Sequence, residues 1–175
     1  MLFIKNAKIL TMSEKNYENG FISVKDGKIS GIGDMTDMPV VSNTDTVIDA
    51  AGMILMPGLV DSHCHIGMVE DSVGFEGDDV NEMTDPITPQ LRAIDGVYHS
   101  DRAFEEALQN GVTTVVTGPG SANVIGGQFA ALKTYGRTVD EMIIKAPCAM
   151  KIAFGENPKT AYHEKHQLPT TRMAT

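Results

Sequence analysis

The most constraining feature of this sequence is a short run that ends in two histidines, Pro57-Gly-Leu-Val-Asp-Ser-His-Cys-His65. Its apolar residues indicate a β-strand, and side chains two positions apart on a strand, such as those of His63 and His65, point to the same face. Two imidazoles placed in this way can bind one ion at about 2.0 to 2.1 Å, the distance that zinc prefers. Two surface histidines can share this spacing by chance. The strand before the pair and the polar loop after it favour a metal site at the C-terminal end of a strand.

Composition limits the classes of protein to which the chain can belong. With 175 residues, 42% of them hydrophobic and 21% charged, it has the composition of a globular domain rather than of a disordered segment. The net charge of -9 and the pI near 4.9 argue against a nucleic-acid partner, which needs clustered Lys and Arg. No apolar run reaches the roughly 18 residues of a membrane span, and Met1–Leu10 is unlike a secretory signal. We therefore expect no membrane partner and a cytoplasmic location, with Cys64 and Cys148 as free thiols.

The first part of the chain, residues 1–57, has the alternating pattern of a small β unit. Phe21–Lys25 and Lys28–Ile32 are expected to be strands joined by Asp26-Gly27, a dipeptide that favours a type I′ turn. Two further apolar stretches continue the β character until Pro57 and Gly58 interrupt it. We therefore predict a domain junction near Pro57.

Residues 58–175 alternate between helical and strand patterns. Asp101–Asn110 places its apolar residues on one helical face, with Ser100 as the expected N-cap and Gly111 as the stop. Val112–Thr117 is rich in β-branched residues, which suits a strand buried on both faces in a parallel sheet. A helix followed by a buried strand indicates a β/α layer.

Three later segments are less regular. Met142–Phe154 is apolar but contains Pro147, so we expect two short extended pieces rather than one central strand. Glu156–Lys165 is expected to be helical after Pro158. Gly118–Gln128 is rich in glycine and is expected to be a loop, and it lacks the Gly-Lys-Ser/Thr ending of a phosphate-binding loop.

Together these features resemble the metal-dependent amidohydrolase superfamily, in particular its imidazolonepropionase-like and prolidase-like branch. The landmarks are, in order, Asp26-Gly-Lys-Ile29, the run from Pro57 to His65, and Gly111-Val-Thr-Thr-Val-Val116, and Gly118–Gln128 is similar to a feature of one subgroup. The resemblance covers essentially the whole chain, and the run ending in His65 is its most specific part. It implies an α/β fold. Residues 58–175 would form the first part of a distorted, TIM-like (β/α)8 barrel, and residues 1–57 would belong to a small β-sandwich beside it.

The resemblance also implies a cofactor and a chemistry. Members of the family hold one or two divalent ions, often zinc, that activate water to attack an amide or a cyclic C–N bond, and His63 and His65 match the first two ligands. Deamination of a heterocycle uses the same activated water. The later ligands are a carboxylated lysine or a glutamate and two more histidines, followed by an aspartate that serves as general base. We therefore expect a divalent metal cofactor and a small-molecule substrate.

Two residues of this sequence are candidates for the third ligand. Lys151 lies between apolar neighbours, where a lysine is costly to bury unless it is neutral, and a lysine that has reacted with carbon dioxide becomes an anionic bridge between two metals. Glu156 follows in Gly155-Glu-Asn-Pro. Equally well, Lys151 can extend along a sheet edge into solvent and Glu156 can begin a helix near Pro158, so both alternatives stay open.

The glycine-rich segment supplies candidate substrate-binding residues. A loop that follows a buried barrel strand lines the pocket, so Ser121, Asn123 and Gln128 are expected to contact substrate through hydrogen bonds. A surface turn with no contact to substrate explains the same residues equally well.

The length of the chain limits how much of a barrel it can form. Residues 59–175 can supply about three or four strand-helix units, whereas a whole barrel needs about 250 residues. We therefore expect a truncated gene product or fragment without the closing strands and the catalytic aspartate, so no catalytic side chain is assigned. An unfinished barrel exposes an apolar sheet edge, which predicts self-association or poor stability. The alternative is a catalytically inert fragment or structural homologue that keeps only part of the metal site.

Overall fold

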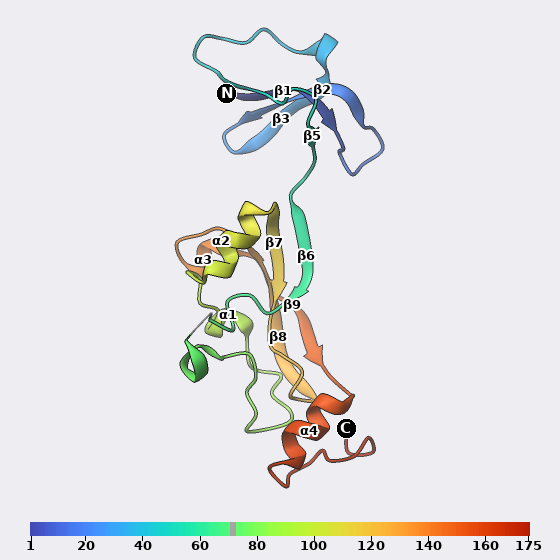
Figure 1. The fold of residues 1–175 in the computed structure, drawn as a ribbon, viewed down its shortest axis with the longest axis vertical. Helices are drawn as coiled ribbons and strands as arrows, with labels where there is room; N and C mark the ends of the chain where they lie inside the picture. The colour runs from blue at the N-terminus through green and yellow to red at the C-terminus, as the bar shows by residue number, and fades with distance from the viewer. Residues whose placement is uncertain (71–72) are drawn as a thin grey trace. The chain divides into compact units, whose positions relative to one another are not determined.

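The computed structural model describes residues 1–70 and 73–175 of the chain (Figure 1). It divides into two units, Met1–Pro57 and Gly58–Thr175, and each unit has its own β-sheet. The fold is therefore a mixed α/β arrangement in which each sheet is formed by strands of one unit only.

The first unit is a five-stranded sheet with the order β3-β2-β1-β4, in which β5 also pairs with β1. Its elements are β1 (Leu2–Ile9), β2 (Tyr17–Lys25), β3 (Lys28–Asp34), the 3-10 helix η1 (Met35–Asp37), β4 (Thr46–Asp49) and β5 (Ile54–Leu55). Asp26 and Gly27 join β2 to β3 with φ values of 51° and 73°, as a type I′ turn requires. The predicted hairpin is confirmed.

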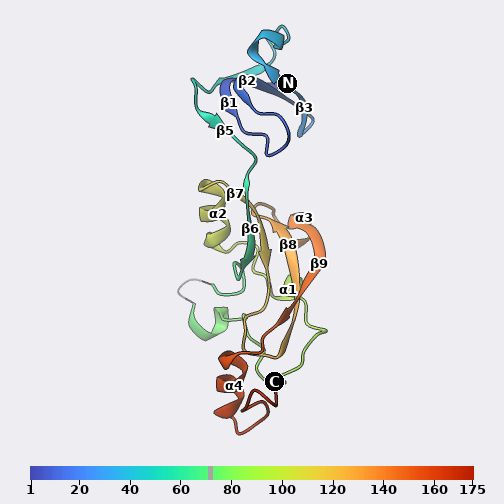
Figure 2. The same ribbon diagram turned by 90° about the vertical axis from the view of Figure 1, so that its right-hand side faces the viewer.

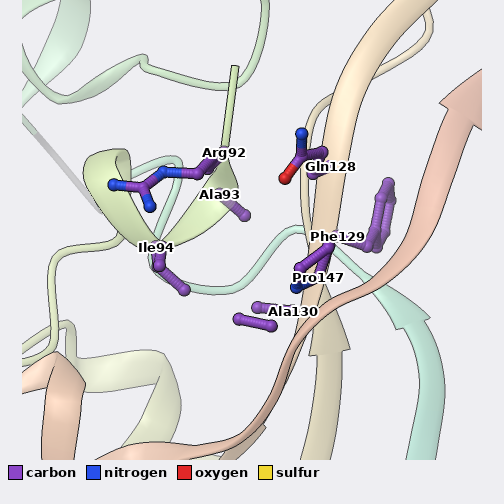
Figure 3. Close-up of a pocket in the computed structure, with 8 residues that line it drawn as sticks. Arg92, Ala93, Ile94, Gln128, Phe129, Ala130 and Pro147 are labelled. Carbon is purple, nitrogen blue, oxygen red and sulfur yellow. The ribbon is translucent and has the colours of Figure 1, made fainter. Parts of the chain in front are cut away.

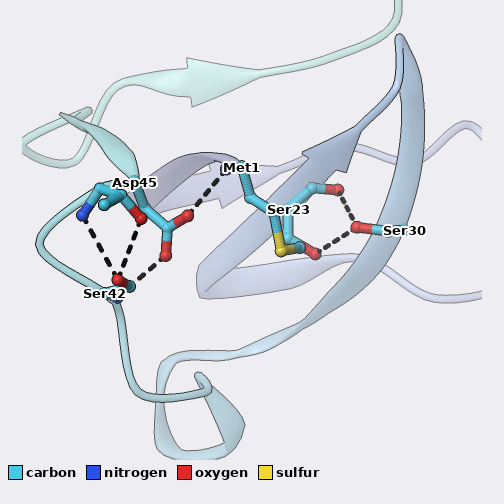
Figure 4. A network of polar contacts seen from close by, with 6 residues as sticks. Met1, Ser23, Ser30, Ser42 and Asp45 are labelled. Atoms are coloured by element: carbon cyan, nitrogen blue, oxygen red, sulfur yellow. Dashed lines mark hydrogen bonds and ion pairs between the residues drawn. The ribbon is translucent and has the colours of Figure 1, made fainter.

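Polar contacts fix the chain around this first sheet (Figure 4). The amino group of Met1 donates to Asp45 Oδ1 at 2.7 Å, and the backbone N–H of Ser42 donates to Asp45 Oδ2 at 2.9 Å. These hydrogen bonds, that of Met1 foremost, lower the pKa of the Asp45 carboxyl. Across the hairpin, the hydroxyl groups of Ser23 and Ser30 lie 3.0 Å apart.

The second unit is built on a four-stranded sheet with the order β6-β7-β8-β9. Its strands are β6 (Leu59–Cys64), β7 (Val112–Thr117), β8 (Ile125–Lys133) and β9 (Ile143–Ile152). The pair β6 and β7 is parallel, whereas β8 is antiparallel to both β7 and β9, so β6, β7 and β9 share one direction. Figure 2 shows β8 and β9 running side by side.

The second unit also contains short helices, two of which, α1 (Ala93–Gly96) and α2 (Arg102–Gln109), lie against one face of this sheet. The other helices in the described residues are the 3-10 helix η2 (Gly74–Gly77), α3 (Val139–Met142) and α4 (Glu156–His163). Helix α1 packs on β8 and α2 packs on β7 (Figures 1 and 2). The buried cluster between these layers consists of Met68, Ala93, Phe104, Val115, Ala130, Leu132 and Met142. None of the helices found in residues 1–70 and 73–175 has the length and apolar character needed to span a bilayer.

The N-cap of α2 differs from the prediction by one residue. The capping carboxylate belongs to Asp101, whose Oδ1 accepts from the N–H of Ala103 at 2.9 Å, and not to Ser100, which is exposed. Asp101 also accepts from the N–H of Gly67 at 3.1 Å through its second oxygen. A carboxylate satisfies two donors at once, which the single hydroxyl oxygen of a serine does less well, and this favours Asp101 as the cap. Gly111, with φ of 84°, ends the helix as predicted.

The division of the segment 142–154 at Pro147 is wrong, because β9 continues through that proline. Two features of the strand accommodate it. β9 is the last strand in the sheet order and pairs only with β8 among the described strands, and its register slips between the pairs Phe129↔Ala149 and Ala131↔Lys145. Pro147 lies within this slip, where no ladder hydrogen bond from its nitrogen is needed, and prolines are tolerated at such positions of edge strands.

The expected loop Gly118–Gln128 is only partly a loop, since β8 begins at Ile125 and includes Gln128. This strand separates β7 from β9, so the expectation that Val112–Thr117 lies in a purely parallel sheet is also wrong. Gly127 shows why the strand is glycine-rich. Its φ is 125°, and a Cβ there would lie 2.7 Å from the carbonyl oxygen of Leu91, which belongs to a segment running beside β8.

Candidate functional site

His63 and His65 stand on one face at the end of β6, with their ring centroids 5.5 Å apart and their planes at 88° to each other. Two imidazoles bound to one tetrahedral ion at about 2.0 to 2.1 Å have centroids about 5 Å apart, so this separation fits a shared ion. Cys64, between them, points the other way and packs against the buried cluster under the helices. Burial raises the pKa of the Cys64 thiol, which makes it a poorer thiolate ligand.

The ring of His65 is oriented by a backbone carbonyl. Its Nδ1 lies 2.7 Å from the carbonyl oxygen of Gly118, just beyond the end of β7. Because a carbonyl oxygen can only accept, Nδ1 carries the proton and Nε2 keeps its lone pair. A histidine that ligates a metal through Nε2 commonly donates its other N–H in this way, so His65 has the form required of a ligand.

Lys151 lies beside the other histidine. Its Nζ is 3.3 Å from Nε2 of His63, across the sheet from β9 to β6. An ammonium group has no lone pair, so Nε2 of His63 accepts this hydrogen bond and its proton is on Nδ1. Burial lowers the pKa of the Lys151 amine below its usual range, because the charged form is less well solvated there.

Glu156, the alternative third ligand, lies elsewhere. It begins α4, and its Oε2 pairs with Nζ of Lys159 on the same helix at 2.7 Å. Lys159 accordingly lowers the pKa of this exposed carboxyl. Of the two candidates, Lys151 is therefore the one that the fold brings to the histidines.

The three candidate substrate-binding residues are separated in the structure. Asn123 is 2% exposed, its Nδ2 donates to Thr88 Oγ1 at 2.9 Å, and its Oδ1 accepts from the hydroxyl of Tyr162 at 2.9 Å. Its amide is therefore occupied in joining three segments of the unit, which favours a structural role.

Ser121 and Gln128 line other parts of the surface. Ser121 borders a shallow pocket beside α4. Gln128 donates from Nε2 to the carbonyl oxygen of Pro89 at 3.0 Å and borders a small cavity with Arg92 and Ala93 (Figure 3). A contact of either residue with substrate stays a prediction.

The geometry supplies part of a metal-binding site. Over residues 1–70 and 73–175, no group of three or more His, Cys, Asp or Glu side chains is placed to hold a metal ion. Catalytic zinc sites commonly have three protein ligands, so the two imidazoles need at least one more donor. The nearest side chain with the required chemistry is Lys151, whose neutral amine can be converted into an anionic oxygen donor. The residues fit a divalent ion held by Nε2 of His63 and of His65.

Two residues of this site were not identified from the sequence. Gly118 supplies the carbonyl that orients His65, and Phe129 lies with its ring centroid 5.3 Å from that of His63. No local motif marks Phe129, and Gly118 was noted only as the first residue of the glycine-rich segment Gly118–Gln128. Gly118 could have been suspected only as the first residue after a strand that neighbours the histidines.

Comparison with known proteins finds amidohydrolases and deaminases that are similar to this chain. A solved amidohydrolase of Thermotoga maritima superposes with a TM-score of 0.90 and 41% identity, over 99% of this chain and 44% of that one. An amidohydrolase, tasK, of Hapsidospora irregularis is 34% identical over 166 residues, which are 88% of this chain and 17% of the relative. A 5'-deoxyadenosine deaminase of Methanosarcina acetivorans is 37% identical over 123 residues, 65% of this chain and 27% of the relative. No protein-family model matches the chain.

Proposed function

Because the chain belongs to the amidohydrolase superfamily, we propose that it supplies the first two metal ligands, His63 and His65, of a hydrolase that cleaves C–N bonds. The observation that carries the proposal is the state of the two imidazoles. In each ring the proton is on Nδ1 and the lone pair on Nε2: the carbonyl of Gly118 fixes this for His65, and the hydrogen bond that Nε2 of His63 accepts from Lys151 fixes it for His63 until a metal takes that place. The chain spans about a sixth of the tasK protein and less than half of the solved relative, so the activity of the whole enzyme is part of this proposal.

The chemistry follows from the donor set. The chemistry that a divalent ion such as zinc would supply at His63 and His65 is a water ligand of lowered pKa and polarisation of the bond under attack. The protein's own part is to present Nε2 of His63 and of His65 toward the ion. Gly118 keeps the His65 ring in the required tautomer.

We infer that Lys151 is the third ligand, as a carbamate. Its amine is already deprived of part of its solvation, so more of it is neutral near neutral pH than in an exposed lysine. The neutral amine attacks carbon dioxide, an N–C bond forms, and the displaced proton goes to water, which leaves an anionic carboxylate on Nζ. This group would supply the anionic oxygen donor that the two histidines lack. Glu156 is the second candidate. To reach the metal it would have to leave its ion pair with Lys159, and α4 would have to lie elsewhere.

The architecture proposed for residues 58–175 is the opening part of a (β/α)8 barrel. The common direction of β6, β7 and β9 supports it, and so does the high similarity to the Thermotoga maritima enzyme. The antiparallel β8 would be an inserted strand between two barrel strands. In a barrel of this kind the histidines stand at the C-terminal end of the first strand, where active sites are built.

The reaction proposed is hydrolysis of an amide or cyclic amide of a small molecule. Deamination of a heterocycle is the second candidate, favoured by the relative named as a deaminase. Both reactions break a C–N bond with the same activated water, and the imidazolonepropionase-like and prolidase-like branch is one proposal within this class. A cytoplasmic location and self-association through the sheet edge at β9 also remain proposals.

The test is an assay of the chain and of a full-length relative on one panel. The panel holds cyclic ureides, N-acyl amino acids, Xaa-Pro dipeptides and adenine nucleosides, and His63→Ala is the control. We expect at least one substrate class of the panel to be hydrolysed. This turnover should require zinc and should be absent from the His63→Ala variant. Turnover by the relative alone would instead favour an inert fragment, and turnover that is unaffected by the loss of His63 would contradict the proposal.

A further inference from the structure

Phe129 is buried on the face of the sheet that the helices do not cover. On β8 its neighbours alternate, so Ala130 and Leu132 belong to the buried cluster under the helices and Phe129 faces the other way. Figure 3 shows its ring on the side of β8 opposite to Ala93 and Ile94. The residue is nevertheless only 4% exposed. Something other than the helical layer must therefore cover it.

The cover consists of the polar side chains of the candidate site. The ring centroid of Phe129 lies 5.3 Å from that of His63 and 6.3 Å from that of His65. The ammonium nitrogen of Lys151 lies 5.8 Å from the same centroid. Lys151 reaches the ring because Phe129 pairs with Ala149 on β9, which makes Lys151 its diagonal neighbour on the same face.

The backbone of Gly118 also packs against the ring of Phe129. A Cβ on Gly118 would lie 2.4 Å from ring carbons of Phe129, so only glycine allows the ring and this backbone to approach so closely. The carbonyl oxygen of the same glycine holds Nδ1 of His65. Phe129 is therefore in contact with both histidines, with Lys151 and with the backbone that orients one of the rings.

We propose that Phe129 is the positioning residue of this centre, whose ring fixes the rotamers in which His63, His65 and Lys151 present their nitrogens. The proposal rests on the proposed function, since it concerns the same metal site. His63 is exposed and would otherwise occupy several rotamers, each of which must be given up when an ion binds. A rigid aromatic surface removes these alternatives before binding and so strengthens it. A stacking contact with substrate does not explain the residue, because its ring has almost no free surface.

The test compares two substitutions on one strand of the 175-residue chain. Phe129→Leu keeps an apolar side chain but removes the flat ring, and Leu132→Val trims a buried side chain that faces the helices instead. Zinc affinity is measured by calorimetry, with absorption of bound Co²⁺ as a second probe, and circular dichroism verifies folding. Nitrogen NMR of the metal-free chain reads the tautomers of His63 and His65. We expect Phe129→Leu to bind zinc about 10- to 100-fold more weakly and to show mixed tautomers, with both properties unchanged in Leu132→Val.

The outcomes distinguish a failure of the positioning role of Phe129 from a failure of the proposed metal site. If the unmodified chain binds zinc through its histidines but Phe129→Leu binds equally well, the positioning role is refuted while the proposed function stands. Equal loss of affinity in Phe129→Leu and Leu132→Val also refutes it, since both would then act through stability alone. If the unmodified chain binds no zinc that depends on His63, the proposed function fails and the positioning role with it.

Discussion

The amine of Lys151 lies 3.3 Å from Nε2 of His63, although 88 positions separate the two residues in the sequence. In this hydrogen bond the Nε2 lone pair of His63 faces the lysine, and burial of the lysine lowers the pKa of its amine. A lysine extended into solvent from a sheet edge would have neither property. The arrangement therefore favours Lys151 over Glu156 as the third ligand.

Replacing Lys151 by Met is expected to weaken zinc binding by about tenfold or more, because it removes the group that can become an anionic donor. The matched control is Lys145→Met, which removes an exposed lysine from the same strand. Zinc affinity is measured at several bicarbonate concentrations, and we expect it to rise with bicarbonate in the unmodified chain and in Lys145→Met but not in Lys151→Met.

Glu156→Gln provides the counter-test for the third ligand. With Lys151 as the ligand, this variant binds zinc like the unmodified chain, since Glu156 is paired with Lys159 on α4. A loss of affinity in Glu156→Gln, with Lys151→Met unaffected, would reverse the assignment.

Asp101→Ala is expected to lower the free energy of unfolding by about 2 to 4 kcal/mol. It removes the N-cap of α2, which contributes about 1 kcal/mol, and leaves the buried N–H of Gly67 without an acceptor, at about 1 to 3 kcal/mol. Ser100→Ala, one residue earlier and exposed, should change stability by no more than about 0.5 kcal/mol. Urea denaturation followed by circular dichroism measures both, and equal effects would disprove the assignment of the cap.

Tyr162 makes stability depend on pH in the alkaline range. Desolvation by burial, the largest cause, raises the pKa of its hydroxyl from 10.0 to about 12. The folded state therefore keeps a proton that the unfolded chain loses, and the stabilising contribution is complete below pH 10 and declines as the pH rises from 10 to about 12. Tyr162→Phe should abolish this part of the decline. It should also cost about 1 to 3 kcal/mol at neutral pH, because Oδ1 of Asn123 loses its donor. Denaturation curves of both proteins at several pH values measure this, and parallel profiles would contradict it.

Gly127→Ala is expected to destabilise the second unit by about 2 kcal/mol or more. Its positive φ disfavours any side chain, and the added carbon would meet the carbonyl oxygen of Leu91. Gly96→Ala, at the last residue of helix α1, is the control, because its methyl group would make an ordinary contact with Met68 at 3.5 Å. Thermal melting should show a large shift for the first variant and none or a small increase for the second.

Local sequence signals predicted those parts of the fold that local interactions determine. The Asp26-Gly27 turn and the stop of α2 at Gly111 follow from backbone preferences of the residues themselves. β8 was missed because Gly126 and Gly127 interrupt its apolar pattern, and their purpose is visible only once the segment around Leu91 lies against the strand. Pro147 led to the opposite error, because a strand was predicted to stop where β9 continues. The strand tolerates this proline because β9 lies at the edge of the sheet.

The residues of the candidate site also differ in whether local sequence could predict them. His63 and His65 could be recognised because their spacing on one strand decides their common face. The neighbourhood of Lys151 could not, because it depends on the register of β8 against β9. The roles of Phe129 and Gly118 follow from contacts across three strands, which the sequence around either residue does not show.

The most direct measurement is the zinc content of the chain after mild purification, compared with that of the double variant His63→Ala, His65→Ala. A variant with His99→Ala and His163→Ala, which replaces two histidines outside the site, controls for the number of imidazoles removed. The account predicts bound zinc in the unmodified chain and in this control, and almost none in the double variant. Equal zinc in all three proteins, or none in any, would contradict a metal centre at the end of β6.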